Sequence, residues 1–317
     1  MVLYIEIKLK LCGLTLELKS IKYSIIIVNY NSLNDIRNCV HSIITKTTTK
    51  DFEIIVVSNS TETKKDIQTI EILHPHLKYI QLDNNYGFSI ANNVGAKNSV
   101  GQFLFFLNPD TIFINDVLNS LFDFLDQRKE IILAGPAIFN EHLELSPSIA
   151  NIPSFMTLTC LAFPVLQFLV TKKYRIGNYI VKKDSEVPMV QGSSMFIRKN
   201  DFFELHMFDE DYFLYSEETD LCYRISKSNK KVGISLSSKL IHVGGTSTSH
   251  NFDKLEIVKH QSRKLFLKKH KPHLLFYNRF AGILGYFSRY LIMTLLLKNQ
   301  KAKYFANLAK WYFYKYK

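Results

Sequence analysis

Between residues 23 and 127 the sequence repeats one pattern four times: an apolar run, a polar cluster and a segment with helical periodicity. The apolar runs, rich in β-branched and aromatic residues, are 23–28, 53–57, 78–82 and 102–107. Uninterrupted apolar runs of this length predict strands buried on both faces, as in parallel sheets covered by crossover helices. The pattern therefore predicts an α/β fold with a doubly wound, mostly parallel sheet and flanking helices.

The helices expected after these strands are 33–45, 64–73, 90–97 and 115–127. Later in the chain we expect strands at 192–198 and 232–236 and helices at Glu217–Lys227, 250–270 and within 274–316. In doubly wound sheets, ligands bind beyond the carboxyl ends of the strands. A binding site is therefore expected among the polar residues at those ends.

Asp110 lies just beyond the apolar run 102–107, in the segment Asn108-Pro109-Asp110-Thr111. A carboxylate at this place points into the crevice, where Mg²⁺ or Mn²⁺ can bridge it to a diphosphate. The same residues also favour a turn, so a purely structural interpretation of this segment stays open.

Six acids lie between Asp209 and Asp220, interleaved with aromatic residues. Ser216 is expected to cap the helix that begins at Glu217, which puts Glu217 and Glu218 where the helix dipole stabilises negative charge. A carboxylate held there can accept a proton from a hydroxyl. Asp220 and Arg224 are spaced for an ion pair. An ordinary acidic first turn is the alternative, although acids among aromatics indicate a semi-buried acidic pocket.

His242 stands at a strand end before Gly244 and Gly245. A single histidine is more often structural than a metal ligand, but the glycines allow backbone to approach a ligand closely. The sequence has no Walker A, G-x-G-x-x-G or G-x-S-x-G pattern, which disfavours P-loop NTPases, Rossmann-type dehydrogenases and α/β-hydrolases. Its four cysteines form no C-x-x-C pair, so neither a zinc cluster nor a disulfide framework is indicated.

These segments, in this order, resemble the family 2 glycosyltransferases with the GT-A fold, especially the bacterial rhamnosyltransferase-like branch of cell-surface polysaccharide synthesis. The matching segments are Ser24 to Asn31, Asn85 to Phe88, Ala91 to Asn93, Leu107 to Thr111, Gln191 to Arg198, Phe208 to Glu210, Glu217 to Arg224, and His242. The resemblance implies an inverting, metal-assisted transfer of a sugar, with rhamnose as one candidate. The donor would be a nucleoside-diphosphate sugar and the acceptor a hydroxyl of a glycan or lipid-linked saccharide.

The resemblance also implies roles for particular residues. Asp110 would bind the Mg²⁺ or Mn²⁺ ion, with His242 completing the metal shell and Asn108 near the ribose. Glu218 matches the catalytic base, with Glu217 and Asp220 beside it. The implied donor-binding residues are Asn29, Tyr30, Asn31, Ser58, Asn59, Asn85, Gly87, Phe88, Asn92, Asn108, Asp110, Gly192 and Arg224.

Two positions depart from the family pattern. The family usually has Val-Asp-Asn after the second strand, with the Asp reading the nucleobase, whereas this chain has Val57-Ser58-Asn59. The base preference is therefore open, or a neighbouring residue makes that contact. The usual Glu-Asp pair is Glu217-Glu218 here, so the base would be one methylene longer.

Positive charge is concentrated at the end of the chain. Residues 254–317 contain 15 Lys and Arg residues and one acid, Glu256, whereas the net charge of all 317 residues is +12. Aromatic residues alternate with these bases, among them Phe276, Phe280, Tyr286, Phe287, Trp311 and Tyr312. This combination suits an anionic membrane surface, and a solvated helical cap over the core is the alternative. We therefore expect an extension of unknown role at 1–22, a GT-A domain at 23–250 and a basic helical tail at 251–317.

No segment is expected to span a membrane, because residues 155–170 are uncharged but short and contain Pro164. Residues 1–22 lack the apolar block of a signal peptide. We therefore expect a cytoplasmic protein that rests on the inner face of the cell membrane. A catalytically silent scaffold or binding subunit of a polysaccharide-assembly complex is an alternative. Nucleic acid is not an expected partner, because the basic tail contains no recognisable binding module.

Overall fold

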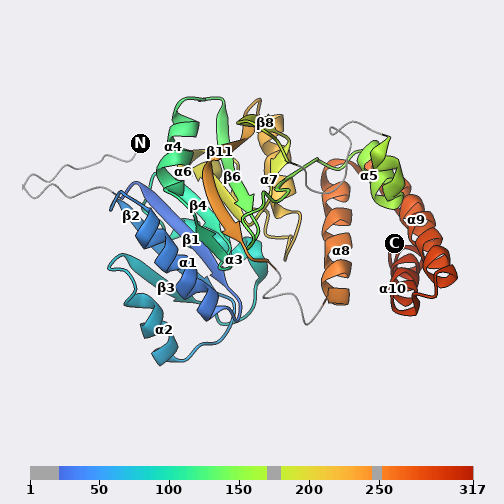
Figure 1. Cartoon of the computed structure of the whole chain (residues 1–317), viewed down its shortest axis with the longest axis horizontal. Helices are drawn as coiled ribbons and strands as arrows, with labels where there is room; N and C mark the ends of the chain where they lie inside the picture. Colours follow the sequence, from blue (N-terminus) through green and yellow to red (C-terminus); the bar gives the residue numbers. More distant parts are fainter. Residues whose placement is uncertain (1–20, 170–179, 245–251, 317) are drawn as a thin grey trace, which may run out of the picture.

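The computed structural model describes residues 21–169, 180–244 and 252–316 (Figure 1). Its centre is a nine-stranded sheet with the order β3-β2-β1-β4-β10-β6-β11-β5, in which β8 pairs with β11. The strands of the first half are parallel neighbours: β3 (Leu77–Gln81), β2 (Phe52–Ser58), β1 (Tyr23–Asn29) and β4 (Phe103–Leu107). The prediction of an α/β fold with a mostly parallel sheet is therefore confirmed.

The second half of the sheet is mixed. β10 (Ser194–Arg198) runs antiparallel between β4 and β6 (Ile131–Phe139), and β11 (Lys231–His242) runs parallel to β6. β5 (Thr111–Phe113) and β8 (Ser185–Val187) are antiparallel to β11, and β7 (Ile149–Ala150) and β9 (Met189–Val190) form a separate pair. The expected strands at 192–198 and 232–236 correspond to β10 and β11, whereas the pattern did not predict β5, β6 or β8.

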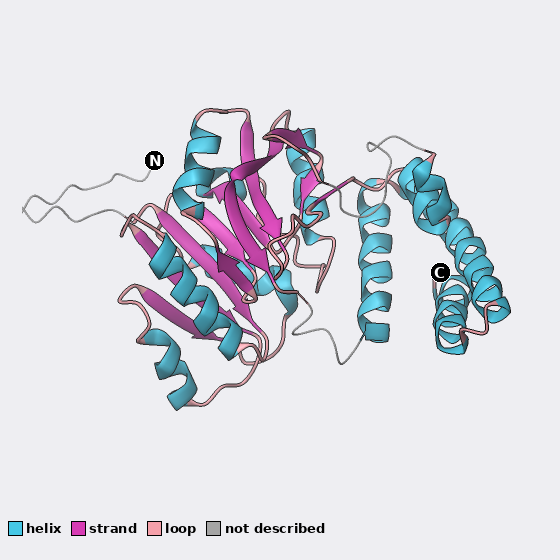
Figure 2. Ribbon diagram, viewed as in Figure 1, coloured by secondary structure: helices cyan, strands magenta, loops and turns pink. Residues whose placement is uncertain are grey.

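Side chains of β1 alternate between the two faces of the sheet, as the strand pleat requires. Ile25 and Ile27 join the core under α1 (Leu33–Lys46) and α4 (Val117–Asp126). Ile26 packs on the opposite side with residues of α3 and α7. Figure 2 shows helices on both sides of the sheet. Each fully buried Ile contributes about 1.5–3 kcal/mol, so the apolar runs hold the two layers of helices in place.

The remaining helices around the sheet are α2 (Lys64–Glu71), α3 (Gly87–Lys97), α6 (Lys199–Glu204) and α7 (Glu217–Lys227). α7 has the predicted bounds, but α3 begins three residues before the expected position. Asn59 explains the difference, because its side chain accepts a hydrogen bond from the Tyr86 N–H (3.1 Å) and donates one to the Gly87 carbonyl (3.0 Å). This clamp allows the helix to start at Gly87, whose φ is +86°.

The C-terminal segment is helical, as predicted. It comprises α8 (Phe252–His270), η4 (Pro272–Leu274), α9 (Leu275–Leu295), α10 (Asn299–Lys310) and a π-helical turn, η5 (Trp311–Lys315). α9 packs along α5 (Phe155–Ala162), where the rings of Phe155 and Tyr277 stack with centroids 4.1 Å apart. In Figure 1, α8 stands between the sheet and the bundle formed by α5, α9 and α10. Within the described ranges, no helix has the length and apolarity that crossing a membrane requires.

α8 attaches this bundle to the α/β part of the chain. The Ser262 hydroxyl donates to the Leu214 carbonyl (2.7 Å), and Lys269 Nζ lies 2.6 Å from Asp211 Oδ2. His270 Nε2 lies 2.5 Å from Oδ1 of Asp220 in α7. The tail is therefore packed on the same helix that begins with Glu217 and Glu218.

His260 is buried at the centre of the C-terminal bundle. Its Nε2 lies 3.2 Å from the Tyr286 hydroxyl and its Nδ1 lies 3.0 Å from the Tyr312 hydroxyl. Burial, aided by the nearby positive charge of Arg263, lowers the pKa of His260 to about 2. The ring therefore stays neutral and joins α8, α9 and η5 in one hydrogen-bonded cluster.

Acid is expected to destabilise this bundle. The unfolded chain binds a proton at His260 below its ordinary pKa of 6.5, whereas the folded ring does so only near pH 2. Stability from this group is therefore complete above pH 6.5 and is lost at up to about 1.4 kcal/mol per pH unit below it. Urea unfolding between pH 7 and pH 5, followed by Trp311 fluorescence, measures the slope. His260→Gln should flatten it, and an unchanged slope in this variant would contradict the assignment.

Gly87→Ala is expected to lower the free energy of unfolding by about 2–4 kcal/mol. A Cβ at Gly87 would lie 2.3 Å from the Phe213 carbonyl oxygen, in a residue with positive φ. Gly244→Ala is the matched control, because Gly244 also has positive φ (+72°) but none of the described residues lies within 4 Å of its Cβ position. The control should cost about 1 kcal/mol. Equal losses in urea unfolding would show that backbone strain, rather than the contact with Phe213, decides the effect.

Candidate active site

The ends of β4 and β11 bring Asp110 and His242 together. Thr111 pairs with His242 in the sheet, and the Val243 N–H donates to the Asp110 carbonyl (3.0 Å). His242 Nε2 consequently lies 3.2 Å from Asp110 Oδ1, and it lies 3.5 Å from Asn108 Nδ2. Both side chains are largely buried, with 9% of Asp110 and 15% of His242 exposed. A carboxylate and an imidazole therefore face each other at the edge where a ligand is expected.

Asp110 is held in its ionised form. Burial by itself would raise the pKa of this carboxyl, but the hydrogen bond and charge of His242, with two backbone N–H donors, outweigh it and lower the pKa. The described residues include no group of three or more His, Cys, Asp or Glu able to enclose a metal. Mg²⁺ and Mn²⁺ are commonly held by one or two protein ligands together with substrate phosphates. Asp110 and His242 fit a cation shared with a diphosphate, and they do not fit a closed protein site.

Glu217 and Glu218 begin α7 and lie beside Gly192. A Cβ at Gly192 would be 3.6 Å from Glu217 Oε1 and equally far from Glu218 Cβ. The next residue, Ser193, accepts a hydrogen bond at its carbonyl from the Asn108 N–H (2.8 Å). The segment 191–194 therefore joins the carboxyl pair to the loop that carries Asp110.

The two carboxyls form a coupled pair. Burial raises the pKa of both, and the charge of Glu218 raises that of Glu217 further. Backbone N–H groups at the start of α7 and a hydrogen bond from Glu217 act in the opposite direction on Glu218. Within the described ranges, Oε2 of each residue is buried without a hydrogen-bond partner. We infer that Glu217 is the protonated member and that Glu218 is the carboxylate able to accept a proton.

The prediction that the Ser216 side chain caps α7 is wrong. Ser216 occupies the N-cap position, but its φ is +68° and its side chain makes no capping hydrogen bond. A capping side chain usually needs extended backbone to reach the N–H groups of the first turn. Tyr215 also has a φ of +68°. Two consecutive left-handed residues are strained, and this strain lies directly before the carboxyl pair.

Asn29 and Ser58, at the ends of β1 and β2, meet a carboxylate that the sequence patterns missed. Glu62 Oε1 accepts from Asn29 Nδ2 (2.7 Å), and Glu62 Oε2 accepts from the Ser58 hydroxyl (2.7 Å) and the Tyr79 hydroxyl (3.0 Å). The chain therefore places an acid beside position 58, where an Asp was expected from the family pattern. The only signal in the sequence was an acid four residues after Ser58.

Of the other predicted donor-side residues, Asn31 contacts this network and three hold the turn that begins α3. The Asn31 N–H donates to the Ser60 hydroxyl (3.0 Å), and Tyr30 is 46% exposed. Asn85 Oδ1 accepts from the Gly87 N–H (3.0 Å), and the Phe88 N–H donates to the Phe213 carbonyl (2.7 Å). Asn59, as described above, holds the same turn. The turn at 85–88 is therefore attached to the loop that leads into α7.

Three predicted site residues contact neither Asp110 nor the carboxyl pair in the hydrogen bonds of the described residues. Asp220 is 1% exposed and binds both His270 and Arg224, with 2.7 Å between its Oδ2 and Arg224 Nε. Arg224 also donates to the Leu205 carbonyl and, at 2.8 Å, to the Met207 carbonyl. Asn92 Nδ2 donates to the Phe88 carbonyl within α3 (3.0 Å). Asp220 and Arg224 therefore stabilise α7 and the loop that precedes it.

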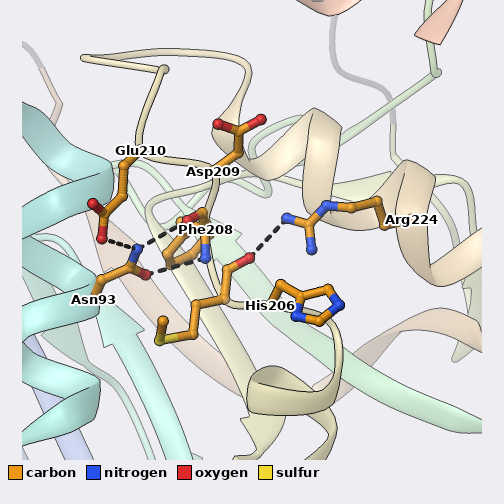
Figure 3. Close-up of a pocket in the computed structure, with 7 residues that line it drawn as sticks. Asn93, His206, Phe208, Asp209, Glu210 and Arg224 are labelled. Atoms are coloured by element: carbon orange, nitrogen blue, oxygen red, sulfur yellow. Dashed lines mark hydrogen bonds between the residues drawn. The ribbon is translucent and has the colours of Figure 1, made fainter. Parts of the chain in front are cut away.

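Figure 3 shows a recess between α7 and the loop that precedes it, with Arg224 of α7 on one side. Asn93 closes the other side of this recess: its amide donates to the Phe208 carbonyl (2.9 Å) and to Glu210 Oε1 (3.0 Å). The Asn93 side-chain oxygen accepts from the Phe208 N–H (3.1 Å). Arg224 and Asn93 thus hold the loop at 205–216, between α6 and α7, from two sides. The position of Glu217 and Glu218, which follow this loop, depends on both residues.

The chain is similar in sequence to known proteins. Residues 24–202, more than half of the chain, match the family model described as glycosyl transferase family 2. The chain is 26% identical over 215 residues to the low-salt glycan biosynthesis hexosyltransferase Agl10 of Haloferax volcanii, covering 66% of this chain and 63% of that protein. It is 25% identical over 238 residues to the rhamnosyltransferase WbbL of Escherichia coli, covering 63% of this chain and 86% of that protein. The first of these matches therefore spans less than two thirds of the relative's length.

A solved structure supports the fold. GalNAc-T7, crystallised with UDP, GalNAc and Mn²⁺, superposes with a TM-score of 0.54 at 18% sequence identity. The superposition covers 70% of this chain and 43% of GalNAc-T7. At this identity the likeness concerns the fold alone, and it agrees with the GT-A-type sheet expected from the sequence. By the match of its residues 24–202, the chain belongs to glycosyl transferase family 2.

Proposed function

We propose that this chain is an inverting glycosyltransferase that moves a sugar from a nucleoside-diphosphate donor to a hydroxyl of a glycan or lipid-linked acceptor. The observation that carries the proposal is the connection between the Asp110–His242 pair and the Glu217–Glu218 pair through residues 191–194. The names of the two relatives, a glycan biosynthesis hexosyltransferase and a rhamnosyltransferase, support a hexose or rhamnose donor and a role in glycan synthesis. The glycan that we propose is a cell-surface polysaccharide.

The donor diphosphate would lie beside Asp110 and His242, which would hold Mg²⁺ or Mn²⁺. When bound, this cation would offset the charge that develops on the departing diphosphate. The nucleoside would extend toward Asn29 and Ser58, where Glu62 supplies a carboxylate. Since Glu62 already accepts four hydrogen bonds, including one from the Ser60 hydroxyl, it would read the base either directly or by orienting Ser58 and Asn29.

Glu218 would accept the proton of the acceptor hydroxyl. As that oxygen bonds to the anomeric carbon, the bond from this carbon to the diphosphate oxygen breaks, and one displacement inverts the configuration. Glu217, protonated and hydrogen-bonded to Glu218, would keep the two carboxyls from carrying two charges before the acceptor arrives. Proton transfer by a positioned carboxylate contributes about 10²–10⁴-fold to a rate.

The buried carboxyl pair favours an enzyme over a catalytically silent scaffold. Burying carboxyls with unpartnered oxygens lowers stability unless a bound group satisfies them. Oε2 of both residues is in this situation within the part of the chain that the structure describes. An acceptor hydroxyl would provide the missing partner, whereas a scaffold has no need of one.

We expect Asp110→Asn to weaken Mn²⁺-dependent binding of the nucleotide-sugar donor by at least about tenfold. The substitution keeps the size of the side chain and removes the charge that would hold the cation. Calorimetric titration of UDP-, dTDP- and GDP-sugars, with and without Mn²⁺ or Mg²⁺, measures the effect and identifies the base. Asp126→Asn, on the exposed side of α4, changes the net charge equally and should bind as the wild type does. Metal-independent binding by Asp110→Asn at full affinity would contradict the assignment.

We expect Glu218→Gln to lower kcat by about 10²–10⁴-fold while donor affinity is kept. Glu217→Gln retains a hydrogen-bond donor to Glu218 and should keep most of the activity. The pKa of Glu218 is raised, so the wild-type rate should fall with acid from a higher pH than an ordinary carboxyl near 4.5 would give. Turnover against pH for the three proteins measures this. An inactive Glu217→Gln beside an active Glu218→Gln would reverse the two roles.

A further inference from the structure

α9 exposes an apolar stripe along its whole length. Its members recur every three or four residues, which places them on one face of the helix. They are Phe276, Phe280, Leu284, Phe287, Leu291 and Leu295. The exposed fraction is 80% for Phe276 and 82% for Leu295, at the two ends of the stripe. We call these six residues the α9 stripe.

The opposite face of α9 is already packed. Tyr286 belongs to the cluster that includes Trp311 and Tyr312, and Gly282 contacts the Tyr312 ring so closely that a Cβ would lie 2.5 Å from it. The sequence pattern counted Tyr286, Trp311 and Tyr312 among the residues of a membrane-facing tail. The structure places these three in the core of the bundle, so the exposed phenylalanines are what remains for an external partner.

Both charged residues of α9 are turned inward. The Arg279 guanidinium donates to the carbonyls of Tyr312 (3.2 Å) and Phe313 (2.7 Å). The Arg289 guanidinium donates to the carbonyl of Ala162 (3.0 Å), near the end of α5. Each arginine therefore donates to backbone carbonyls of the bundle, and the α9 stripe contains no charged residue.

Exposed apolar side chains also occur on two segments connected to α9, which are the turn that follows α5 and the residues just after α9. α5 is held against α9 so tightly that a Cβ at Gly285 would lie 2.4 Å from the Ala162 carbonyl oxygen. The 3₁₀ turn after α5, η1 (Pro164–Phe168), exposes 75% of Val165 and 77% of Phe168. At the end of α9, Leu297 is 84% exposed. Monomers rarely expose apolar side chains in such contiguous groups without a partner.

Exposed positive charge follows α9 in the chain, in and just before the helix α10 that packs against it. Lys298, Lys301, Lys303 and Lys310 are exposed in and just before α10. The sequence has no Asp or Glu after Glu256. A second copy that met this face with its own α9 and α10 would bring like charges together, because neither helix contains an Asp or Glu to pair with these lysines. An exposed apolar stripe, together with lysines that have no acidic partner among the described residues, fits a surface that is apolar inside and anionic outside.

We propose that the α9 stripe, with Val165 and Phe168 of η1, is a docking surface for an anionic lipid bilayer. α9 would lie in the plane of the interface over about 30 Å, with its phenylalanines among the acyl chains and the lysines of α10 at the headgroups. The proposal rests on the proposed function, because it would hold the enzyme where a lipid-linked acceptor is found. α8 joins this surface to α7 through His270 and Asp220.

Co-sedimentation of the full chain with phosphatidylcholine vesicles, with and without phosphatidylglycerol, tests the proposal. Phe276→Gln/Phe280→Gln/Phe287→Gln should reduce partitioning onto anionic vesicles by about a hundredfold or more. Glutamine forms helices well, so α9 should persist. The matched control is Ile72→Gln/Val100→Gln/Leu143→Gln, which removes three apolar side chains of the α/β part that are at least as exposed as the phenylalanines. The control should partition as the wild type does.

A second triple variant separates charge from apolar contact. Lys298→Gln/Lys301→Gln/Lys303→Gln should lose the preference for phosphatidylglycerol by about tenfold or more. Point variants are needed because removing the tail would also remove the contacts of His270 with Asp220 in α7 and of Lys269 with Asp209 in the loop before it. Wild-type partitioning by the phenylalanine variant would overturn the proposal. Self-association of the wild type that this variant abolishes would also overturn it, in favour of a second copy as the partner.

Failure of this inference can be told apart from failure of the proposed function. Binding of the nucleotide sugar is measured in the absence of vesicles and does not involve α9. If donor binding is intact in the phenylalanine variant but the wild type ignores vesicles, the docking surface is wrong and the proposed function stands. If no nucleotide sugar binds to the wild type, the proposed function fails whatever the vesicles show.

Discussion

The candidate active site depends on the place where β10 enters the sheet. β10 runs antiparallel between β4 and β6, so Ser194 pairs with Leu107, the last residue of β4. This pairing brings Gly192 and Ser193 next to Asn108 and, on their other side, next to the acids that begin α7. A parallel strand in this position would have ended, rather than begun, at the edge where ligands bind. One antiparallel strand therefore connects the candidate metal side of the site to the candidate base.

Holding the two acids at that edge requires extensive support. Tyr215 and Ser216 are both left-handed just before α7, and His206 and Met207 are left-handed at the start of the same loop. Such conformations persist only where surrounding contacts determine them. Those contacts come from Asn93 and Arg224 inside the α/β part and from α8 outside it. The C-terminal helices therefore support the active-site loop, besides presenting the exposed face of α9.

Local sequence patterns predicted the parallel half of the sheet because each of its strands is a continuous apolar run followed by a polar turn. They failed at β6, whose sequence contains Gly135 and Pro136 and so resembles a turn. The structure accommodates Pro136 at an irregularity, where the pairing of β11 shifts between Ser235 and Lys239. The irregularity that accommodates Pro136 lies on β11, about 100 residues further along the chain. A local sequence pattern around β6 therefore cannot show it.

For the site, the sequence by itself determined which acids stand at the strand end and at the helix start, because those positions follow from local periodicity. Only the tertiary structure decided which of them meet. In the tertiary structure, Asp110 pairs with His242, Glu62 contacts Ser58, and Asp220 and Arg224 stabilise α7. The tertiary structure also divided the aromatic residues of the tail between a buried cluster and the exposed α9 stripe. These outcomes depend on contacts between residues distant in the chain, and local sequence patterns do not encode them.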